Sequence, residues 1–429
     1  MRMLVIGDSD SYVKWGAALA SRLPAAWRRE LVVLRSPVQP SDAQLETALV
    51  GTDFAPADVT FADLAQLTAL IDERGPDVVL AAVRGPVVRV IARAVRRALW
   101  RPVFITGLPG ITIPAARKAI VYRAHADLIV LHSRREVRDF TELARKMGHP
   151  QRFALSTLPF VPDNPAPGDP GGDIIFAAQA IVPRERDDRM LLLGWLAECA
   201  RRHPERRVVV KVRAAPGEAQ THAEEHDFAS IMGELSPPAP DNLVVAGGPM
   251  SAHLAGASAL VTVSSTAAVE AVAAGIPVLL VDDFGVMPGL INTVFEGSGL
   301  LAGSDDLVAA RFRRADESWV HDNYLHGREF DDWFERVEEL VAARDRGELP
   351  WRIPRERVLG GALRHAWDRR RALGEFDRSL SGVVAVAIGT PARWLVRRWR
   401  KIARLLRSPA DAASAPPQAR QPELARRLP

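Results

Sequence analysis

Val261-Thr-Val-Ser-Ser-Thr-Ala-Ala-Val-Glu-Ala-Val-Ala-Ala-Gly-Ile-Pro-Val-Leu-Leu-Val281 is the stretch of this sequence that decides the fold. Its apolar run at 259–263 predicts a buried strand, and a hydroxyl-rich turn and a short helix follow. Gly-Ile-Pro then ends the helix, and residues 278–281 predict a second strand. A strand, a helix and a strand in this order indicate a parallel α/β sheet.

The turn in this stretch predicts a binding site for a phosphate and a ribose. Ser264, Ser265 and Thr266 stand where the helix begins, so its free N–H groups and positive dipole end can hold a phosphate. Glu270 follows about one turn later, on the expected exposed side, where a carboxylate can accept hydrogen bonds from a ribose diol. The alternative is an ordinary helix whose Ser and Thr only cap its first turn. The combination with Glu270 and Gly-Ile-Pro favours the nucleotide site.

Composition restricts the class of protein. A chain of 429 residues with 48% hydrophobic and 25% charged residues is typical of a soluble protein with two domains. Its single cysteine, Cys199, excludes an intramolecular disulfide, and no Cys/His cluster has metal-ligand spacing. We therefore expect no metal and no cofactor. The N-terminus lacks the pattern of a signal peptide, so we expect a cytoplasmic protein.

The basic charge is concentrated at the C-terminus. The net charge is +4, but residues 390–429 hold ten Arg/Lys and two Asp/Glu, a local 10 − 2 = +8, which leaves 4 − 8 = −4 for residues 1–389. A basic segment on a slightly acidic body predicts an anionic membrane surface as a partner, and no nucleic acid.

Short β-branched runs alternate with helix-length stretches along most of the chain, which predicts two Rossmann-like domains facing across a cleft. The run at 162–172 contains too many Pro and Gly residues for a regular element and is the expected linker. The expected division is a first domain at 1–161, the linker at 162–172, a second domain at 173–315, C-terminal helices at 316–379, a basic amphipathic helix at 380–407 and a disordered tail at 408–429. Within the C-terminal helices we expect four aromatic packing anchors, Trp319, Phe330, Trp333 and Phe334.

The loop after the first strand carries two candidate general bases, Asp8 and Asp10. Polar groups that follow a strand of a parallel sheet lie at its carboxyl edge, where ligands bind. Lys14, in the same loop, is a candidate contact to a ligand. In the alternative interpretation, Asp8 or Ser9 caps the next helix and Lys14 is a solvated residue of its first turn.

Two further loops of the first domain are candidates for contact with a ligand. Gly107 and Gly110 permit a tight turn close to a ligand. His132 follows the strand at 128–132, where a structural role is equally consistent with the sequence.

The second domain carries further candidates for binding the nucleotide. Gln179 ends a strand, where its amide can bond a phosphate or a sugar hydroxyl. Lys211 and Arg213 end another strand and share one side of it, an arrangement suited to an anion. Thr221 and His222 follow in a polar loop that offers donors and acceptors to a nucleotide or a sugar.

These residues resemble the GT-B class of nucleotide-sugar glycosyltransferases. Gly7-Asp-Ser-Asp-Ser-Tyr-Val-Lys-Trp15, Phe176-Ala-Ala-Gln-Ala-Ile-Val-Pro183 and Gly217-Glu-Ala-Gln-Thr-His222 are similar to an uncharacterised glycosyltransferase family of high-GC Gram-positive bacteria. The resemblance covers about residues 1 to 310. It implies that the first domain holds the acceptor and the second holds the nucleotide-sugar donor. The candidate acceptor-binding residues are then Lys14, Gly107, Gly110 and His132.

A more distant likeness connects the Lys211/Arg213 loop and the Ser264-Ser265 turn with bacterial sialyl- and Kdo-transferases, in which a His-Pro and a Ser-Ser motif grip a CMP-sugar. This sequence departs from that pattern, because Ala-Ala-Pro follows Arg213 and the two His-Pro pairs stand elsewhere, at His149-Pro150 and His203-Pro204.

The resemblance and the residues together predict a metal-independent glycosyltransferase that acts on a cell-envelope polysaccharide or a lipid-linked acceptor. Lys211, Arg213 and the hydroxyl turn would stabilise the departing phosphate, and Asp10 or Asp8 would activate the acceptor hydroxyl if the reaction inverts configuration. Two alternatives stay open, a UDP-sugar 2-epimerase of the same fold and a non-catalytic nucleotide-sugar or glycan-binding protein at the membrane.

Residues 393–407 place apolar side chains on one helical face and Arg/Lys on the other, with no acidic residue. This pattern predicts an interfacial helix that holds the protein at the inner membrane face. A basic helix that packs back on the first domain is the alternative.

Overall fold

A computed structural model of the chain describes residues 1–159, 161, 167–180, 182–212, 226–353 and 361–389. Three predicted donor-binding residues, Arg213, Thr221 and His222, lie outside this part of the chain, as do residues 390–429 with the basic segment. The chain divides into two compact units, Met1–Arg357 with Ala372–Asp377, and Val358–Arg371 with Arg378–Pro429. Each unit is described by itself.

The first sheet of the larger unit has seven parallel strands among the described residues. Their order is β3-β2-β1-β4-β5-β6-β7. The strand order reverses between β1 and β4, where connections leave in opposite directions. The strands are β1 (Arg2–Gly7), β2 (Arg28–Leu34), β3 (Thr60–Ala62), β4 (Val78–Ala82), β5 (Val103–Gly107), β6 (Leu128–Leu131) and β7 (Phe153–Leu155).

The second sheet repeats this plan with six described strands, all parallel, in the order β10-β9-β8-β11-β12-β13. Its order reverses between β8 and β11. The strands are β8 (Asp173–Ala177), β9 (Val208–Lys211), β10 (Leu243–Ala246), β11 (Ala257–Thr262), β12 (Val278–Val281) and β13 (Leu301–Ala302). Residues 261–281 therefore form the end of β11, a helix and β12, as predicted.

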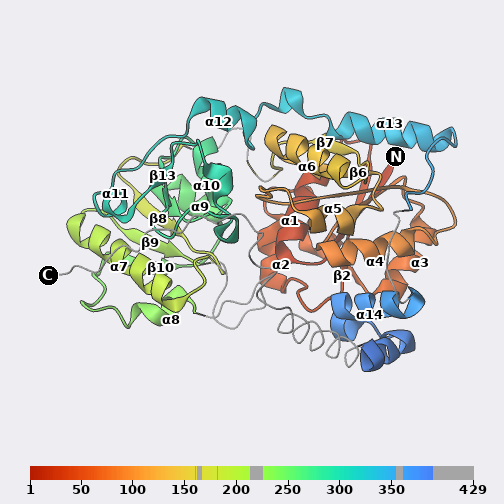
Figure 1. Ribbon diagram of the computed structural model, residues 1–429, viewed down its shortest axis with the longest axis horizontal. Coiled ribbons are helices and arrows are strands. Elements are labelled where there is room, and N and C mark those ends of the chain that lie inside the picture. Colours follow the sequence, from red (N-terminus) through yellow and green to blue (C-terminus); the bar gives the residue numbers. More distant parts are fainter. Residues whose placement is uncertain (160, 162–166, 181, 213–225, 354–360, 390–429) are drawn as a thin grey trace, which may run out of the picture. The chain divides into compact units, whose positions relative to one another are not determined.

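Helices cover both faces of each sheet (Figure 1), so each sheet has a core on either side. Along β1, Met3 and Val5 enter one core while Leu4 and Ile6 enter the other, the period of two that a strand imposes. Helices of the first sheet are α1 (Asp10–Ala20), α2 (Asp42–Leu49), α3 (Leu64–Arg74), α4 (Gly85–Val95), α5 (Arg117–Arg123) and α6 (Arg134–Lys146). Those of the second are α7 (Arg186–Arg202), α8 (Phe228–Met232), α9 (Met250–Ala255), α10 (Ala267–Ala273) and α11 (Ser304–Val308).

Local sequence signals set several helix ends. Ser41 and Asp63 each accept a hydrogen bond from the backbone of the Gln three residues later, and that Gln bonds back, so α2 and α3 begin with capping boxes. Gly75 ends α3 in the left-handed conformation, with φ of 61°. These ends place α2 and α3 between consecutive strands, as a parallel sheet requires.

The chain returns to the first sheet after the second. Beyond α12 (Glu317–Asp322), helix α13 (Trp333–Asp345) inserts Trp333 and Val337 into the core that contains Val5 and Trp27. The predicted anchors Trp319 and Trp333 are buried, and Phe334 packs partly buried against the same core. The prediction for Phe330 is wrong, because this ring is half exposed and lies under the guanidinium of Arg134, 4.0 Å from its centroid.

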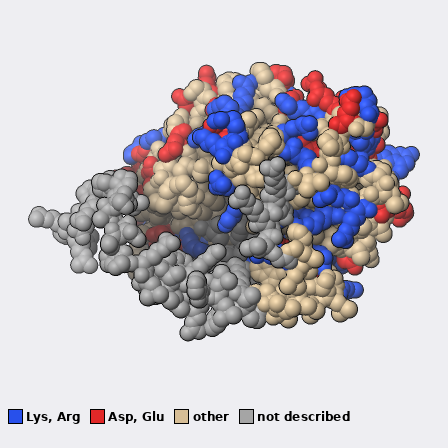
Figure 2. Space-filling view, turned by 45° about the vertical axis from the view of Figure 1, so that its right-hand side comes forward, with Lys and Arg blue, Asp and Glu red and all other residues tan. Residues whose placement is uncertain are grey.

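The smaller unit contains α14 (Gly361–Leu373) up to residue 371, and a second helix at 380–389. Within the described part of the chain, no helix combines the length and the apolar character needed to cross a bilayer. Figure 2 shows Lys and Arg side chains interspersed with Asp and Glu on the face it presents.

Candidate functional site

The loops after β8 and β11 leave the second sheet at the point where its strand order reverses. Ligands of doubly wound sheets bind at such a point, outside the carboxyl ends of the strands. Gln179 follows β8, and the hydroxyl turn follows β11. The topology therefore brings together two predicted donor-binding segments that are about 85 residues apart in the sequence.

Gln179 and Ser264 are bonded to each other across this point. The Gln179 amide oxygen accepts from the Ser264 backbone N–H at 3.0 Å and lies 3.2 Å from the Ser264 hydroxyl. The Gln179 amide nitrogen lies 3.1 Å from the same hydroxyl. Ser264 is buried, so these bonds satisfy polar groups that would otherwise be costly. Gln179 and Ser264 thus hold the turn in one conformation.

The next two residues of the turn serve the start of α10. The Ser265 hydroxyl accepts from the Ala267 backbone N–H at 3.2 Å, and the Ser265 backbone N–H donates to the Thr262 hydroxyl at 3.3 Å. Thr266 occupies the N-cap position, but its side chain makes no capping hydrogen bond. Ser265 therefore caps the start of α10, which is the alternative that the sequence left open.

The charges of two lysines from different elements act on Glu270. Burial raises the pKa of the Glu270 carboxyl, and the positive charges of Lys14 and Lys211 lower it in part. Lys14 is on α1, whereas Lys211 ends β9 and is buried. Glu270 was expected on the exposed side of its helix, and its side chain is partly exposed. A carboxylate flanked by two cations beside a helix start is suited to a ligand that carries both hydroxyls and phosphates.

Gly110 brings the loop after β5 to the same turn. Its φ is +88°, a backbone conformation that favours glycine, and a Cβ at this position would lie 3.3 Å from the Thr266 methyl group. Two predicted acceptor-binding residues, Lys14 and Gly110, therefore lie next to predicted donor-binding residues.

The structure assigns Asp8 to a buried ion pair. Its carboxylate accepts from the Arg84 side-chain Nε at 2.8 Å and from the Arg84 backbone N–H at 3.1 Å. Burial raises the pKa of Asp8, and Arg84 opposes that shift. Because the side chain is fully buried and bonded, it has no access to an acceptor hydroxyl, and the assignment of Asp8 as a base does not fit this structure.

Asp10 has the accessibility that Asp8 lacks. It is the first residue of α1, it is only half buried, and the Ser11 hydroxyl donates to it at 3.3 Å. Ser9 holds the N-cap position, but its side chain makes no capping bond and its buried hydroxyl has no hydrogen-bond partner among the described residues. The capping alternative thus fails for the side chains of both Asp8 and Ser9.

His132 is a structural residue, which corrects its assignment to the acceptor site. Its Nε2 accepts from the Trp15 indole N–H at 2.6 Å, and its Nδ1 lies 2.8 Å from the Ser156 carbonyl oxygen. These contacts require the proton on Nδ1. Burial lowers the pKa of the imidazole to about 4, so the ring is neutral at physiological pH.

Gly107 also has a packing role rather than a role at the ligand. It is buried at the end of β5, and a Cβ at this position would clash with the Trp15 ring. The same ring donates to His132. Two residues chosen from the sequence as ligand contacts therefore hold one tryptophan in the core.

Sequence reasoning missed Arg84. It follows β4, directly across the strand-order reversal from Asp8, which follows β1, and its side chain is partly exposed. The available signal was its position in Val83-Arg84-Gly85-Pro86, after a strand and before a helix with Pro in its first turn. The Asp8–Arg84 pair connects the loops after β1 and β4 in the first sheet. The Gln179–Ser264 pair connects the loops after β8 and β11 in the second sheet.

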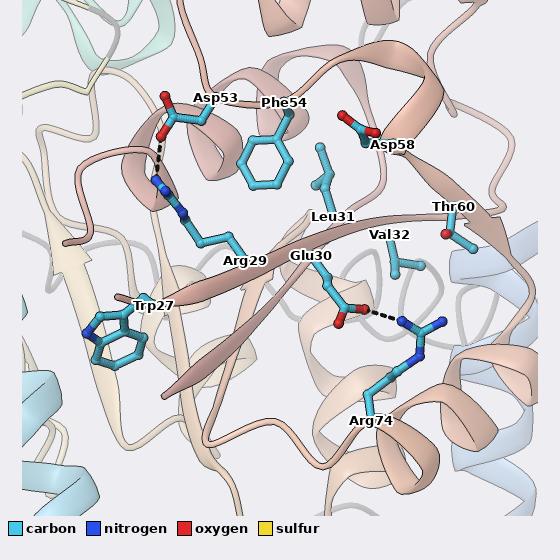
Figure 3. A pocket seen from close by; sticks show the side chains of 10 residues that line it. All are labelled: Trp27, Arg29, Glu30, Leu31, Val32, Asp53, Phe54, Asp58, Thr60 and Arg74. Atoms are coloured by element: carbon cyan, nitrogen blue, oxygen red, sulfur yellow. Dashed lines mark hydrogen bonds and ion pairs between the residues drawn. The ribbon is translucent and has the colours of Figure 1, made fainter. Parts of the chain in front are cut away.

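A pocket of about 480 Å³ lies elsewhere, beside the first half of β2 (Figure 3). Arg29 and Glu30 line it, paired respectively with Asp53 and Arg74. These residues stand near the amino end of β2, whereas ligands of parallel sheets bind at the carboxyl ends. We therefore do not assign the donor to this pocket. Among the described residues, no group of three or more His, Cys, Asp or Glu is arranged to hold a metal ion.

Comparison with known proteins agrees with this architecture. A family model described as "Putative glycosyltransferase (DUF6716)" matches residues 3–340. No protein with a curated description matches the chain.

Solved structures with a similar fold include the UDP co-structure of MnaA from S. aureus, at a TM-score of 0.51 and 12% identity over 82% of this chain and 99% of that one. A second is the structure described as "putative UDP-N-acetylglucosamine 2-epimerase from Listeria monocytogenes", at a TM-score of 0.50 and 12% identity over 81% of this chain and 97% of that one. A third is the UDP-GlcNAc 2-epimerase from Methanocaldococcus jannaschii, at a TM-score of 0.50 and 10% identity over 79% of this chain and 99% of that one. At these identities the likeness shows the fold, two parallel α/β domains, as predicted.

Proposed function

Since the chain belongs to the family described as "Putative glycosyltransferase (DUF6716)", we propose that it transfers a sugar from a nucleotide-sugar donor to a cell-envelope polysaccharide or a lipid-linked acceptor, without a metal ion. The donor lies at the carboxyl ends of β8 and β11. The observation that carries this assignment is the position of Glu270 beside the Ser264–Thr266 turn, with Lys14 and Lys211 acting on its carboxylate.

In this proposal each group has a separate task. Glu270 accepts hydrogen bonds from the ribose hydroxyls. Lys14 and Lys211 supply the positive charge that the departing nucleotide phosphate requires, which is the task of a divalent cation in other transferases. Arg213, Thr221 and His222 remain predicted donor contacts outside the described residues.

The acceptor reaches the site from the β1–α1 loop. If the reaction inverts configuration, Asp10 removes the proton of the acceptor hydroxyl as the glycosidic bond of the donor breaks, while a retaining reaction needs no such base. Asp8 acts indirectly, because its ion pair with Arg84 holds the loop that presents Asp10.

A thermal-shift screen of UDP, GDP, CMP, CDP and TDP tests donor binding. A ligand at a hundred times its dissociation constant should stabilise the protein by about 2.7 kcal/mol. Absence of a shift with all five nucleotides would contradict the donor site.

Incubation of the sugar nucleotide with and without acceptor then separates the possible reactions. Transfer that depends on the acceptor supports a glycosyltransferase. Conversion of the donor sugar without an acceptor would indicate an epimerase, an activity that the same fold supports in the structures above, and binding with no turnover would indicate a non-catalytic protein.

We also propose that the protein acts at the inner membrane face, held there by the basic segment 393–407. The support is its composition, seven Arg/Lys and no acidic residue, since each basic side chain near anionic lipid adds about 1 kcal/mol to binding. Truncation after Gly389 should abolish sedimentation with anionic vesicles and leave nucleotide affinity unchanged. Equal sedimentation of both forms would contradict this attachment.

A further inference from the structure

The helix at 380–389 has two apolar faces, and among the described residues only one of them is covered. Its buried face packs on α14, where Ala385 forms a small core with Ala366 and Trp367, and Val386 packs against this core. A Cβ on Gly389 would lie 2.6 Å from the Trp367 ring, so the end of the helix is also held closely against that ring. The helix is therefore seated on α14 along one side.

The opposite face exposes large apolar side chains. We call it the exposed stripe; relative exposure is 84% for Leu380, 52% for Val383, 51% for Val384 and 54% for Ile388. At about 100° per residue these four side chains fall within an arc of about 140°. Ala385, Val386 and Gly389 fall on the other side of the helix. The exposed stripe is thus a continuous surface, and contiguous exposed apolar surface usually marks an interaction site.

The unit that carries the exposed stripe is basic. Residues 379–389 contain no charged side chain, whereas residues 361–371 and 378–389 together hold five arginines and one aspartate, 5 − 1 = +4. Arg364 and Arg371 lie over the Trp367 ring at 4.8 Å and 4.7 Å. The sequence that follows, 390–429, adds a charge of +8. An apolar stripe on a basic unit, followed by a basic sequence, is complementary to a layer of anionic lipid, with acyl chains below a negative surface.

We propose that the exposed stripe inserts into the acyl region of an anionic membrane leaflet and supplies the apolar part of the membrane contact, an inference that rests on the proposed attachment through 393–407. The helix lies in the plane of the interface, since its ten described residues extend only about 15 Å, half the thickness of a hydrocarbon core. The basic sequence supplies attraction that salt screens. The stripe supplies a contribution that salt does not screen.

The test uses the full-length chain and vesicles of phosphatidylcholine with or without phosphatidylglycerol. In the double variant Val384→Ser and Ile388→Ser, binding to anionic vesicles in high salt should fall about tenfold or more, because two apolar side chains no longer enter the bilayer. The matched control is Leu99→Ser, which alters a side chain 85% exposed in the larger unit and should leave binding unchanged. Val384 and Ile388 are both exposed, so the melting temperature of the double variant should equal that of the wild type.

A labelled variant tests insertion directly. Cys199, the single cysteine, is buried, and burial raises the pKa of its thiol to about 11. Val384→Cys can therefore be labelled selectively with a polarity-sensitive dye, whose emission should shift to the blue on anionic vesicles. Leu99→Cys labelled in the same way should show no shift.

Equal binding of wild type and the double variant, with no dye shift, would refute insertion of the exposed stripe. It would not contradict attachment through 393–407. A dye shift that depends on protein concentration without vesicles would identify a second copy of the chain as the occupant instead, and would also refute insertion. Failure of the wild type to bind vesicles would refute both.

Discussion

The amide group of Gln179 joins β8 to β11 through Ser264, with its oxygen 3.0 Å from the Ser264 backbone nitrogen and its nitrogen 3.1 Å from the Ser264 hydroxyl. Asp8 and Arg84 form the corresponding link between β1 and β4 in the first sheet. In each sheet, a side chain that follows the first strand accepts a hydrogen bond from the backbone that follows the fourth. Polar groups therefore connect the two loops at the strand-order reversal of each sheet.

Replacement of Gln179 by Leu should lower the free energy of unfolding by about 1–3 kcal/mol, because the buried Ser264 groups lose their partner. Nucleotide affinity should fall as well, since the turn is no longer held. Gln179→Glu keeps an acceptor for the Ser264 N–H and is the matched control. Urea unfolding and calorimetric titration measure the two effects, and a Leu variant as stable as the wild type would contradict the role assigned to this bond.

Replacement of Glu270 by Gln or Ala should weaken nucleotide binding by about 1.5–3 kcal/mol, the contribution of a hydrogen bond to a charged group. The fold should remain intact, because Glu270 is partly exposed on α10. Glu338→Gln, on the exposed side of α13, provides the control. Titration of the folded variants with the nucleotide that the thermal-shift screen identifies measures this affinity. Unchanged affinity would show that Glu270 is not part of the donor site.

Asp10→Asn and Asp8→Asn should have different effects. Loss of a general base lowers the rate about 10²–10⁴-fold, so the Asp10 variant should lose turnover while keeping its melting temperature and its donor affinity. The Asp8 variant should instead lose stability by about 1–3 kcal/mol, since Arg84 loses a charged partner. Rates at saturating donor and thermal unfolding distinguish the two, and normal turnover of Asp10→Asn would show that this loop does not supply the base.

His132 should make the protein less stable in mild acid. Its pKa is about 4 when folded against 6.5 when unfolded, so the unfolded chain binds the proton first. The stabilisation is complete above pH 6.5 and is lost as the pH falls towards 4, with about 2 kcal/mol lost by about pH 5.

His132→Asn retains a donor for the Ser156 carbonyl and removes the titration, so its stability should depend less steeply on pH. The exposed His321→Asn should behave as the wild type. Urea unfolding at several pH values measures this, and identical slopes for wild type and His132→Asn would exclude His132 as the source.

The sequence by itself determined the elements and the fold class. A period of two in strands such as Met3 to Ile6, and Gly-Ile-Pro after the helix at 267–273, are local signals, because they depend on a residue and its near neighbours. The same holds for the Ser264–Thr266 turn, whose three polar residues are adjacent in the chain. These features were predictable because local geometry and burial on one face act over a few residues.

Tertiary structure alone decided the role of each polar side chain. Asp8 and Asp10 are equivalent in a sequence, but Arg84 from another strand pairs with Asp8 and leaves Asp10 at the helix start. His132 and Gly107 become structural because both meet Trp15, a residue about a hundred positions earlier. Such partners are joined by strand order, and the large cost of burying an unpaired polar group makes the partner, rather than the residue type, determine the role.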